Sequence, residues 1–308
     1  MTLIDARTHD LVAILRGTFT MGSDHHYPEE APAHVVSVGP FRIAATPVTN
    51  DDFAAFVSAT GHVTLAEQAP DPAQYPDANP ALLVAGSSVF VPPAHPVHRL
   101  DPYQWWQWLP GADWRHPYGP RSTLDGLGSH PVVHVAFDDA AAYARWAGRR
   151  LPTEAEWEFA ARGGLDAATY AWGEEFTPGG VRMANTWQGE FPVLSLTGER
   201  TSAVGSFPVN GYGLADMIGN VWEWTTDFWA AHMATSCCGP TPQDPRGGVA
   251  ESSVDPTAPG PGIPRRAMKG GSHLCAPNYC RRYRPAARLP QPVDTATSHL
   301  GFRCAADA

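Results

Sequence analysis

Glycine and proline interrupt this chain so often that long helices and long strands are excluded along most of it. There are 29 glycines and 31 prolines in 308 residues, roughly a fifth of the chain, which is above the average share but below that of disordered chains. Eleven tryptophans and twelve phenylalanines indicate a packed interior. A chain of this length can bury a core without disulfide bonds. The sequence therefore predicts an ordered fold that is rich in loops.

Short helices and strands are predicted between these interruptions. The clearest helix lies in RLPTEAEWEFAARGG at 150–164, where a threonine N-cap, a glutamate three residues later and two final glycines mark its ends. A similar helix begins at Thr49. A third is expected to begin at Asp138 or Asp139, directly after a strand. The predicted strands are 15–23, 34–44, 130–137 and 221–229.

The arrangement of these elements indicates one domain. No internal repeat and no linker are visible, and periodicity is weak beyond residue 165. We therefore expect residues 1–308 to form a single mixed α/β domain with little regular secondary structure.

Charge and hydropathy exclude some classes of partner. The formal net charge is −10 and no basic stripe runs through the sequence, so nucleic acid is not expected to bind. The N-terminal stretch MTLIDARTHDLVAILRGTF lacks the basic and apolar regions of an export signal. No apolar stretch approaches the roughly 18 residues that span a bilayer. We expect a cytoplasmic protein without membrane contact.

Two of the five cysteines, Cys275 and Cys280, lie five residues apart in GGSHLCAPNYCRRYRPAAR at 270–288. A structural zinc ion would need about four ligands, and Cys237 and Cys238 are an awkward pair because they are adjacent. Nearby arginines favour thiolates, so a reversible disulfide is open. Thiolates also select copper(I), which two ligands can hold. From the residues alone, a redox disulfide, a soft-metal site and two unrelated buried cysteines remain equally open.

The same stretch resembles the active-site signature of the formylglycine-generating enzymes, also called sulfatase-modifying factors. Other blocks resemble this family in the same order, over nearly the whole chain. They are GTFTMGS, PVTNDDFAAFVSATGHVT, HPVVHVAFDDAAAYARWAGRRLPTEAEWEFAARGG, YAWGEEFTPGG, ANTWQGEFP, NGYGLADMIGNVWEWT and GFRCAAD. RLPTEAEWE and GNVWEW identify only the broad superfamily. The cysteine pair inside GGSxLCxxxYCxRYRxAAR is therefore the discriminating feature.

The resemblance implies a fold and a reaction. The fold is a compact, irregular α/β domain that is distantly similar to C-type lectins. The reaction is the oxidation by O₂ of a cysteine in a Cys-x-Pro-x-Arg stretch of an unfolded sulfatase, which yields Cα-formylglycine. Cys275 and Cys280 would hold Cu(I) as a pair of thiolates, and the substrate thiol would bind as a third ligand. We expect a monomer, and no nicotinamide or flavin fingerprint is present.

The resemblance also implies three residues beside the cysteines. Ser272 matches an active-site serine, although a hydroxyl after two glycines also suits a turn. Tyr279 would line the pocket and Trp222 would lie beside the reaction site, but both are equally typical of a core. The spacing of the arginines around Tyr283 predicts a strand in which some of them pair with acids. These arginines are Arg281, Arg282, Arg284 and Arg288.

An aromatic segment, PYQWWQWLPGADWRHPYGP at 102–120, resembles the family's stretch at the rim of the substrate groove. A core cluster beneath a long loop is the equal alternative. A histidine stands before LGFRC, where relatives carry a polar residue near the active site. The candidates for substrate contact are Trp105, Trp106, Trp108, Trp114 and His299.

The stretch NGYGLADMIGNVWEW resembles a family calcium site, with a turn capped by polar residues as the alternative. A second family site would begin at Asn185 and Thr186. Because VLSLTGERTSAVGSF is short and lacks the aspartate of its counterparts, this second site is expected to be incomplete. The ligands of the first site would be the side chains of Asp216 and Glu223 and the carbonyls of Gly219 and Val221.

Two other functions are compatible with the broad superfamily. Related iron-dependent sulfoxide synthases carry a His-x-x-x-His-x-Glu motif. Here His130 and His134 have the first spacing, but Ala136 stands in place of the glutamate. A lectin-like binding module without catalysis would be expected to lack the cysteine pair, so the presence of both cysteines favours the oxidase.

Overall fold

The computed structural model describes residues 11–98, 101–198, 200–233, 240–258 and 262–308. Regular elements are short in this part of the chain. The α-helices are α1 (Asn50–Thr60), α2 (Phe137–Trp146) and α3 (Glu154–Arg162). The strands are β1 (Leu11–Ile14), β2 (Gly17–Met21), β3 (His34–Val38), β4 (Phe41–Ala44), β5 (Gly86–Phe90), β6 (Trp106–Pro110), β7 (Gly189–Glu190), β8 (Leu194–Ser195), β9 (Trp222–Phe228), β10 (Arg265–Lys269), β11 (Arg288–Pro292), β12 (Leu300–Gly301) and β13 (Ala305–Asp307). Single 3₁₀ turns are η1 (Pro28–Glu30), η2 (Leu65–Glu67), η3 (Pro80–Leu82), η4 (Pro102–Gln104) and η5 (Pro178–Gly180).

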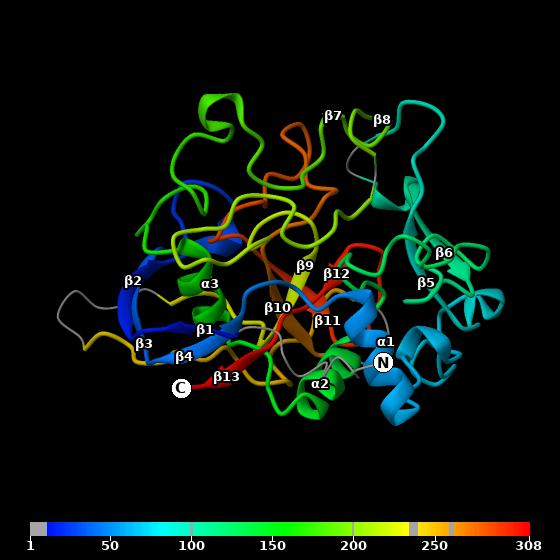
Figure 1. Cartoon of the computed structure of the whole chain (residues 1–308). Helices are drawn as coiled ribbons and strands as arrows, with labels where there is room; N and C mark the ends of the chain where they lie inside the picture. Colours follow the sequence, from blue (N-terminus) through cyan, green and yellow to red (C-terminus); the bar gives the residue numbers. More distant parts are fainter. Residues whose placement is uncertain (1–10, 99–100, 199, 234–239, 259–261) are drawn as a thin grey trace, which may run out of the picture.

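The largest sheet has the strand order β11-β10-β9-β12 and lies at the centre of the molecule (Figure 1). Its strands are antiparallel except for the parallel pair β9–β12. A three-stranded sheet, β1-β4-β13, joins both ends of the described chain, and three hairpins complete the set. Figure 1 shows the hairpin β5–β6 and the small hairpin β7–β8 on the periphery. The strands predicted at 15–23, 34–44 and 221–229 are confirmed as β2, β3 with β4, and β9.

Helices α1 and α3 begin and end where their caps predict. In α3, Thr153 Oγ1 accepts a hydrogen bond from Glu156 N (3.0 Å), and Glu156 accepts one from Thr153 N (2.8 Å). Both helices end at a glycine in the left-handed conformation, Gly61 with φ 69° and Gly163 with φ 57°. These signals are local, so the sequence alone identifies them.

The strand predicted at 130–137 is wrong, and so is the predicted cap of the following helix. Only an isolated bridge between Pro131 and Thr49 is described in that segment, and His134 has φ 61°, which interrupts an extended chain. Helix α2 has Ala136 as its N-cap. Asp139 is the third helical residue and accepts a hydrogen bond from Ala136 N (2.9 Å). Val132, Val133 and Val135 are all buried, by tertiary contacts rather than by a neighbouring strand.

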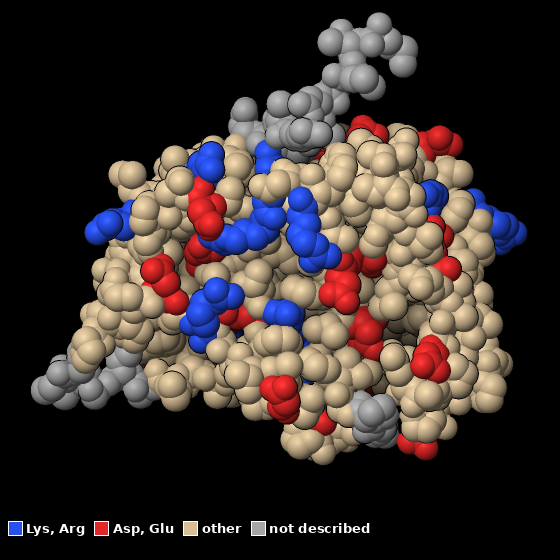
Figure 2. Space-filling view, turned by 90° about the horizontal axis from the view of Figure 1, so that it is seen from below, with Lys and Arg blue, Asp and Glu red and all other residues tan. Residues whose placement is uncertain are grey.

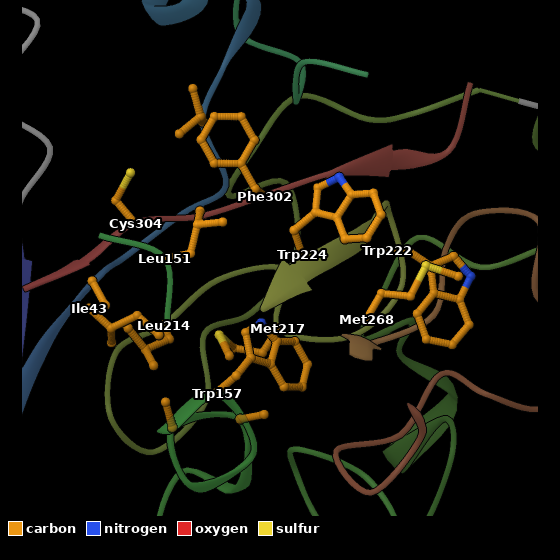
Figure 3. Close-up of a cluster of buried hydrophobic side chains, with 14 of the residues drawn as sticks. Ile43, Leu151, Trp157, Leu214, Met217, Trp222, Trp224, Met268, Phe302 and Cys304 are labelled. Atoms are coloured by element: carbon orange, nitrogen blue, oxygen red, sulfur yellow. The ribbon is translucent and has the colours of Figure 1, made fainter. Parts of the chain in front are cut away.

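The hydrophobic interior is divided into two clusters. The larger one packs α1, α2 and α3 against the central sheet, and its tryptophans include Trp157 and Trp224, both 0% exposed. Figure 3 shows Cys304 at one end of this cluster, and Trp222 with Met268 at the other. The smaller cluster contains Phe90, Trp105, Trp187, Phe191, Leu274 and Ala276. It lies against the segment that carries the cysteine pair, because two of its members belong to that segment.

Buried ion pairs fasten both ends of the segment that joins β10 to β11. Lys269, the last residue of β10, donates to Glu158 of α3 (2.8 Å) and is 0% exposed. Arg288, the first residue of β11, donates to both carboxylate oxygens of Glu154 (2.6 and 2.8 Å). The arginines before it form no strand, so that prediction is wrong for 281–287, but their predicted pairing with acids is confirmed. Arg284, for example, binds Glu30.

Charged side chains of both signs are interspersed on the face drawn in Figure 2. This agrees with the absence of a basic stripe in the sequence. Among the residues that the structure describes, no helix has both the length and the apolar character needed to cross a membrane.

Candidate functional site

Cys275 and Cys280 lie together at one turn of the segment between β10 and β11. Their Sγ atoms are 3.2 Å apart, and both are free thiols. Cys275 is buried (2% exposed), whereas Cys280 is half-buried and is flanked by the exposed Tyr279. The pair therefore has one buried cysteine and one that is partly exposed.

The turn is set by two glycines and Ser272. Gly270 and Gly271 have φ values of 95° and 71°, and a Cβ on Gly271 would lie 2.6 Å from the carbonyl oxygen of Arg282. Ser272 is 0% exposed, and its backbone N–H donates to Cys275 Sγ (3.4 Å). Its hydroxyl accepts a hydrogen bond from Leu274 N (3.2 Å). Ser272 thus touches the site through its backbone while its hydroxyl holds the turn.

The pKa values of the two thiols are shifted in opposite directions. Burial raises the pKa of Cys275 well above its usual value, and the hydrogen bond with Cys280 acts in the same direction. That hydrogen bond lowers the pKa of Cys280, and Arg282 lowers it further, against the effect of burial. The pair therefore loses its first proton easily from Cys280 and retains the second on Cys275. One nucleophilic sulfur is available near neutral pH.

The positive charge near Cys280 comes from a residue that is fixed by a distant part of the chain. Arg282 Nη1 lies 3.8 Å from Cys280 Sγ, and its Nε donates to Glu29 Oε1 (2.9 Å). Its guanidinium carbon also lies 3.8 Å from the ring centroid of Tyr27. The sequence indicated the arginine as a pKa modifier or an ion-pair partner, but not Tyr27 or Glu29, which are about 250 positions away and carry no local motif.

An aromatic stack borders the open sulfur. The ring of Tyr279 stacks on Phe191 (4.5 Å between centroids, 8° between planes) and meets Trp105 edge-on (5.4 Å). Tyr279 is 39% exposed, and burial of its hydroxyl raises its pKa to about 12. Trp105 is 1% exposed and packs edge-on against Tyr279, which agrees with the core cluster that the sequence left open as the equal alternative to a rim. Phe191 was not predicted from the sequence.

The other three predicted tryptophans lie in three different places. Trp106 packs on the ring of His299 (4.7 Å), which accepts or donates a hydrogen bond with Thr297 (2.8 Å), and burial lowers the pKa of His299 to about 3. Trp108 instead lines a cavity of about 620 Å³ together with Tyr75 and other residues. Trp114 belongs to the main core, where it packs edge-on against Phe53 (5.2 Å), so it is not a rim residue.

Trp222 is 2% exposed and belongs to the same buried cluster as Cys275. Its backbone N–H donates to the carbonyl of His299 (2.9 Å), which joins two predicted site residues across the sheet. The position of Trp222 therefore fits both interpretations of the sequence, a core tryptophan and a residue beside the reaction site.

The predicted calcium ligands surround one irregular turn. Asp216 Oδ2 accepts a hydrogen bond from Gly205 N (2.7 Å), while Oδ1 is buried and has no hydrogen-bond partner. Burial raises the pKa of Asp216, and the charge of Glu223 acts in the same direction. Both oxygens of Glu223 already accept hydrogen bonds from Arg303 (2.7 and 2.8 Å). The turn therefore holds two carboxylates, of which one has an unused buried oxygen.

The two side chains predicted for the second calcium site form hydrogen bonds within the protein. The side-chain amide of Asn185 donates to Arg200 O (3.1 Å) and to Asn220 Oδ1 (3.3 Å). Thr186 Oγ1 is 3.0 Å from the amide nitrogen of Gln188.

Cys304 and His134 do not extend the site. Cys304 is buried in the main core (1% exposed), and Cys237 and Cys238 lie outside the described residues. Both ring nitrogens of His134 are engaged, with Ser87 Oγ (2.6 Å) and Pro117 O (2.9 Å), so the iron motif considered from the sequence is not assembled around it. Within the described ranges, no group of three or more His, Cys, Asp or Glu side chains could hold a metal ion. A metal at Cys275 would therefore have two protein sulfurs as its ligands.

Comparison with known proteins gives a consistent result over the whole chain. A family model described as the sulfatase-modifying factor enzyme 1-like domain matches residues 3–308. The chain is 56% identical over 306 residues to the formylglycine-generating enzyme of Mycobacterium tuberculosis, covering 97% of this chain and 98% of the relative. For the enzyme of the same name from Streptomyces coelicolor, the identity is 45% over 315 residues, with 98% and 90% covered.

Not every relative is catalytic by name. The chain is also 38% identical to the inactive C-alpha-formylglycine-generating enzyme 2 of Mus musculus, with 97% of this chain and 86% of the relative covered. Among solved structures, PvdO from Pseudomonas aeruginosa has a TM-score of 0.59 at 24% identity, covering 97% of this chain and 94% of that one. This similarity concerns the fold alone, and it confirms the irregular α/β architecture expected from the sequence.

Proposed function

The chain belongs to the sulfatase-modifying factor family, and on this premise we propose that it is a copper-dependent oxidase. It converts a cysteine in a Cys-x-Pro-x-Arg stretch of a sulfatase to Cα-formylglycine with O₂. The observation that carries the proposal is the pair of free thiols, with Sγ atoms 3.2 Å apart, one of them half-exposed. Family membership alone would not suffice, because a relative that is named inactive is also 38% identical over 97% of this chain.

The donor set fits monovalent copper. Two sulfur ligands, with no cluster of three or more His, Cys, Asp or Glu ligands among the residues that the structure describes, suit a soft ion that accepts low coordination numbers. A structural zinc site would require about four ligands. When bound at Cys275 and Cys280, copper would supply the redox chemistry that amino-acid side chains lack, including activation of O₂.

The residues around the sulfurs have separable tasks. Cys280 provides the thiolate that forms first, because Cys275 and Arg282 lower its pKa. Ser272 fixes Cys275 through its backbone N–H. Tyr279 and the aromatic rings beneath it form an apolar wall on the open side of the pair. This wall would exclude water from one side of an incoming peptide and orient its cysteine toward the sulfurs.

Calcium is proposed where the turn that contains Asp216 leads into β9, with the side chains of Asp216 and Glu223 and the carbonyls of Gly219 and Val221 as ligands. The support is the buried Asp216 Oδ1 without a hydrogen-bond partner, close to a second carboxylate. Oxygen ligands on an irregular turn suit Ca²⁺. An increase of the melting temperature with added Ca²⁺, abolished by Asp216→Asn, would test this site.

The oxidase proposal is tested with a synthetic peptide that contains Cys-x-Pro-x-Arg. Copper-loaded protein and peptide are incubated in air, and the aldehyde is detected by mass spectrometry after capture with a hydrazide. We expect turnover with the wild-type protein and none with Cys275→Ser. A matched control is Cys304→Ser, since Cys304 is buried outside the site. Absence of aldehyde with the wild type, or undiminished turnover by Cys275→Ser, would contradict the proposal.

A further inference from the structure

Arg282 is bound at both edges of its guanidinium group. On one edge, Nε donates to Glu29 Oε1 (2.9 Å) and Nη2 contacts the same oxygen. On the other edge, Nη1 lies 3.8 Å from Cys280 Sγ. The planar fork of arginine permits this division of donors, which a lysine ammonium does not reproduce.

The group that fixes Arg282 is a small assembly at the N-terminal end of η1. Tyr27 covers one face of the guanidinium at 3.8 Å, and its hydroxyl accepts a hydrogen bond from Arg281 N (3.0 Å). The side chains of Arg282 and Glu29 are each 20% exposed, so the ion pair is largely shielded from solvent. Its position is therefore defined by three contacts rather than by charge alone.

Neighbouring arginines do not have this arrangement. Arg284 gives its donors to Glu30 and to the carbonyl of Arg281 (2.8 Å). Arg281 is exposed, and its side chain interacts with Tyr170 and Tyr283. No contact between either side chain and Cys280 is described. Arg282 is thus distinguished from two residues of the same charge close to it in sequence.

Two thiolates around a monovalent metal ion carry one net negative charge. Placing that charge in a partly buried site is costly unless a cation or hydrogen-bond donors oppose it. Cys275 has a backbone N–H as its donor, and Cys280 has Arg282. Groups behind metal ligands commonly tune affinity in this way.

We propose that Arg282, oriented by Glu29 and Tyr27, is a positioning residue that donates to the Cys280 thiolate and strengthens binding of monovalent copper by the cysteine pair. This inference rests on the proposed copper site and extends it to the η1 turn. It makes the Tyr27–Glu30 segment a functional part of the metal site, although it is about 250 positions away in the sequence.

The test measures affinity for Cu(I) under anaerobic conditions by competition with a chromophoric chelator. The Cys275→Ser protein gives the background from the other cysteines. We expect Arg282→Gln to bind on the order of tenfold more weakly than the wild type. Arg282→Lys should lose less, because it keeps the charge. Arg281→Gln, which removes the same charge one residue away, should stay within about twofold of the wild type.

Glu29→Gln separates orientation from charge. Removing the negative charge of Glu29 near the two thiolates would by itself strengthen Cu(I) binding, because less negative charge would then offset the positive charge of Arg282. The proposal predicts weaker binding instead, because the guanidinium loses the partner that directs it toward Cys280. Tighter or unchanged binding by Glu29→Gln would overturn the orienting role. Unchanged binding by Arg282→Gln, or an equal loss in Arg281→Gln, would overturn the proposal as a whole.

A measurement on the metal-free wild type does not depend on the folding of a variant. Two methanethiosulfonate reagents of similar size, one anionic and one cationic, are compared for their rates at Cys280 by peptide mass spectrometry, each relative to free cysteine. A guanidinium beside the sulfur should favour the anionic reagent several-fold. Equal rates, or a preference for the cationic reagent, would contradict the position of Arg282. If the wild type binds no Cu(I) above background, the proposed copper site is wrong. The comparison of the two reagents would still decide whether Arg282 acts on Cys280.

Discussion

Charged groups are paired in the interior around α3, whereas the polar groups in the turn that carries the cysteine pair have few partners. Behind the turn, Lys269, Glu158 and Arg162 are almost fully buried, and every charge has an oppositely charged partner within 2.8 Å. In the turn, Cys280 is half-exposed, and its contacts are another thiol and one arginine at 3.8 Å.

This difference separates groups that hold the fold from groups that remain available for chemistry. A buried charge whose partner is removed costs several kcal/mol, so the ionic groups are confined to their present arrangement. A half-exposed thiol has a low cost of rearrangement and keeps a free side for a ligand. Substitutions in the two regions should therefore affect different measurements.

The largest effect is expected on activity, from Cys280→Ser. The substitution removes the sulfur with the lowered pKa and leaves an oxygen that is a poor ligand for soft metals, so formation of the aldehyde should be abolished. The melting temperature should change little, because Cys280 is only half-buried. Thermal unfolding and the peptide assay on the same preparation provide the measurement. A large loss of stability would show that the two regions are not separable.

The next largest effect is expected from Lys269→Met, at the end of β10. Glu158 would keep Arg162, but the buried charges of Glu154 and Glu158 would lose a shared cation. We expect a loss of about 3–5 kcal/mol in the free energy of unfolding, measured with urea. A loss below about 1 kcal/mol would mean that methionine packing compensates for the missing ammonium group.

Acid should weaken the interior in two steps. Burial lowers the pKa of His134 and His273 to about 4, from 6.5, so stability is full above pH 6.5 and falls as the pH approaches 4. Burial opposes ionisation of Glu158, but Lys269 and Arg162 lower its pKa to about 2, from 4.5, so its contribution is lost between pH 4.5 and pH 2. Urea unfolding over this range should show a decrease on the order of 1 kcal/mol per pH unit per group. His273→Gln should flatten the upper step, and an unchanged pH profile would contradict the assignment.

The smallest effect is expected at a surface pair. Arg115 is 41% exposed in its side chain and binds Glu67 while it covers the Trp114 ring at 4.3 Å. Replacement by glutamine should cost no more than about 1 kcal/mol, because solvent screens the exposed charge. This variant is the matched control for Lys269→Met. An equal loss in both would show that burial does not distinguish the two ion pairs.

The sequence predicted those parts of the molecule whose signals are local. The caps at Thr49 and Thr153 lie within three residues of their partners, so α1 and α3 could be identified directly. The prediction for the segment around His134 failed because its short apolar, valine-rich run is typical of a strand, while a positive φ and tertiary packing decide its conformation.

The candidate site shows the same limit. The adjacency of Cys275 and Cys280 was expected from a signature that spans a few residues. The contact of Glu29 with Arg282 joins residues 253 positions apart, and nothing in either local pattern specifies it. The sequence left Trp105 open between a groove rim and a core cluster, because its buried position depends on contacts with Phe191 and Tyr279, from other parts of the chain.

The fastening of the β10–β11 segment at Lys269 and Arg288 has a consequence for how a polypeptide meets the sulfurs. Ion pairs hold this segment at both ends and also within it, at Arg282 and Arg284, so its outward movement would break several of them at once. Any conformational change on binding must then occur in the substrate polypeptide. This favours a nascent or extended segment over one that is already part of a folded domain.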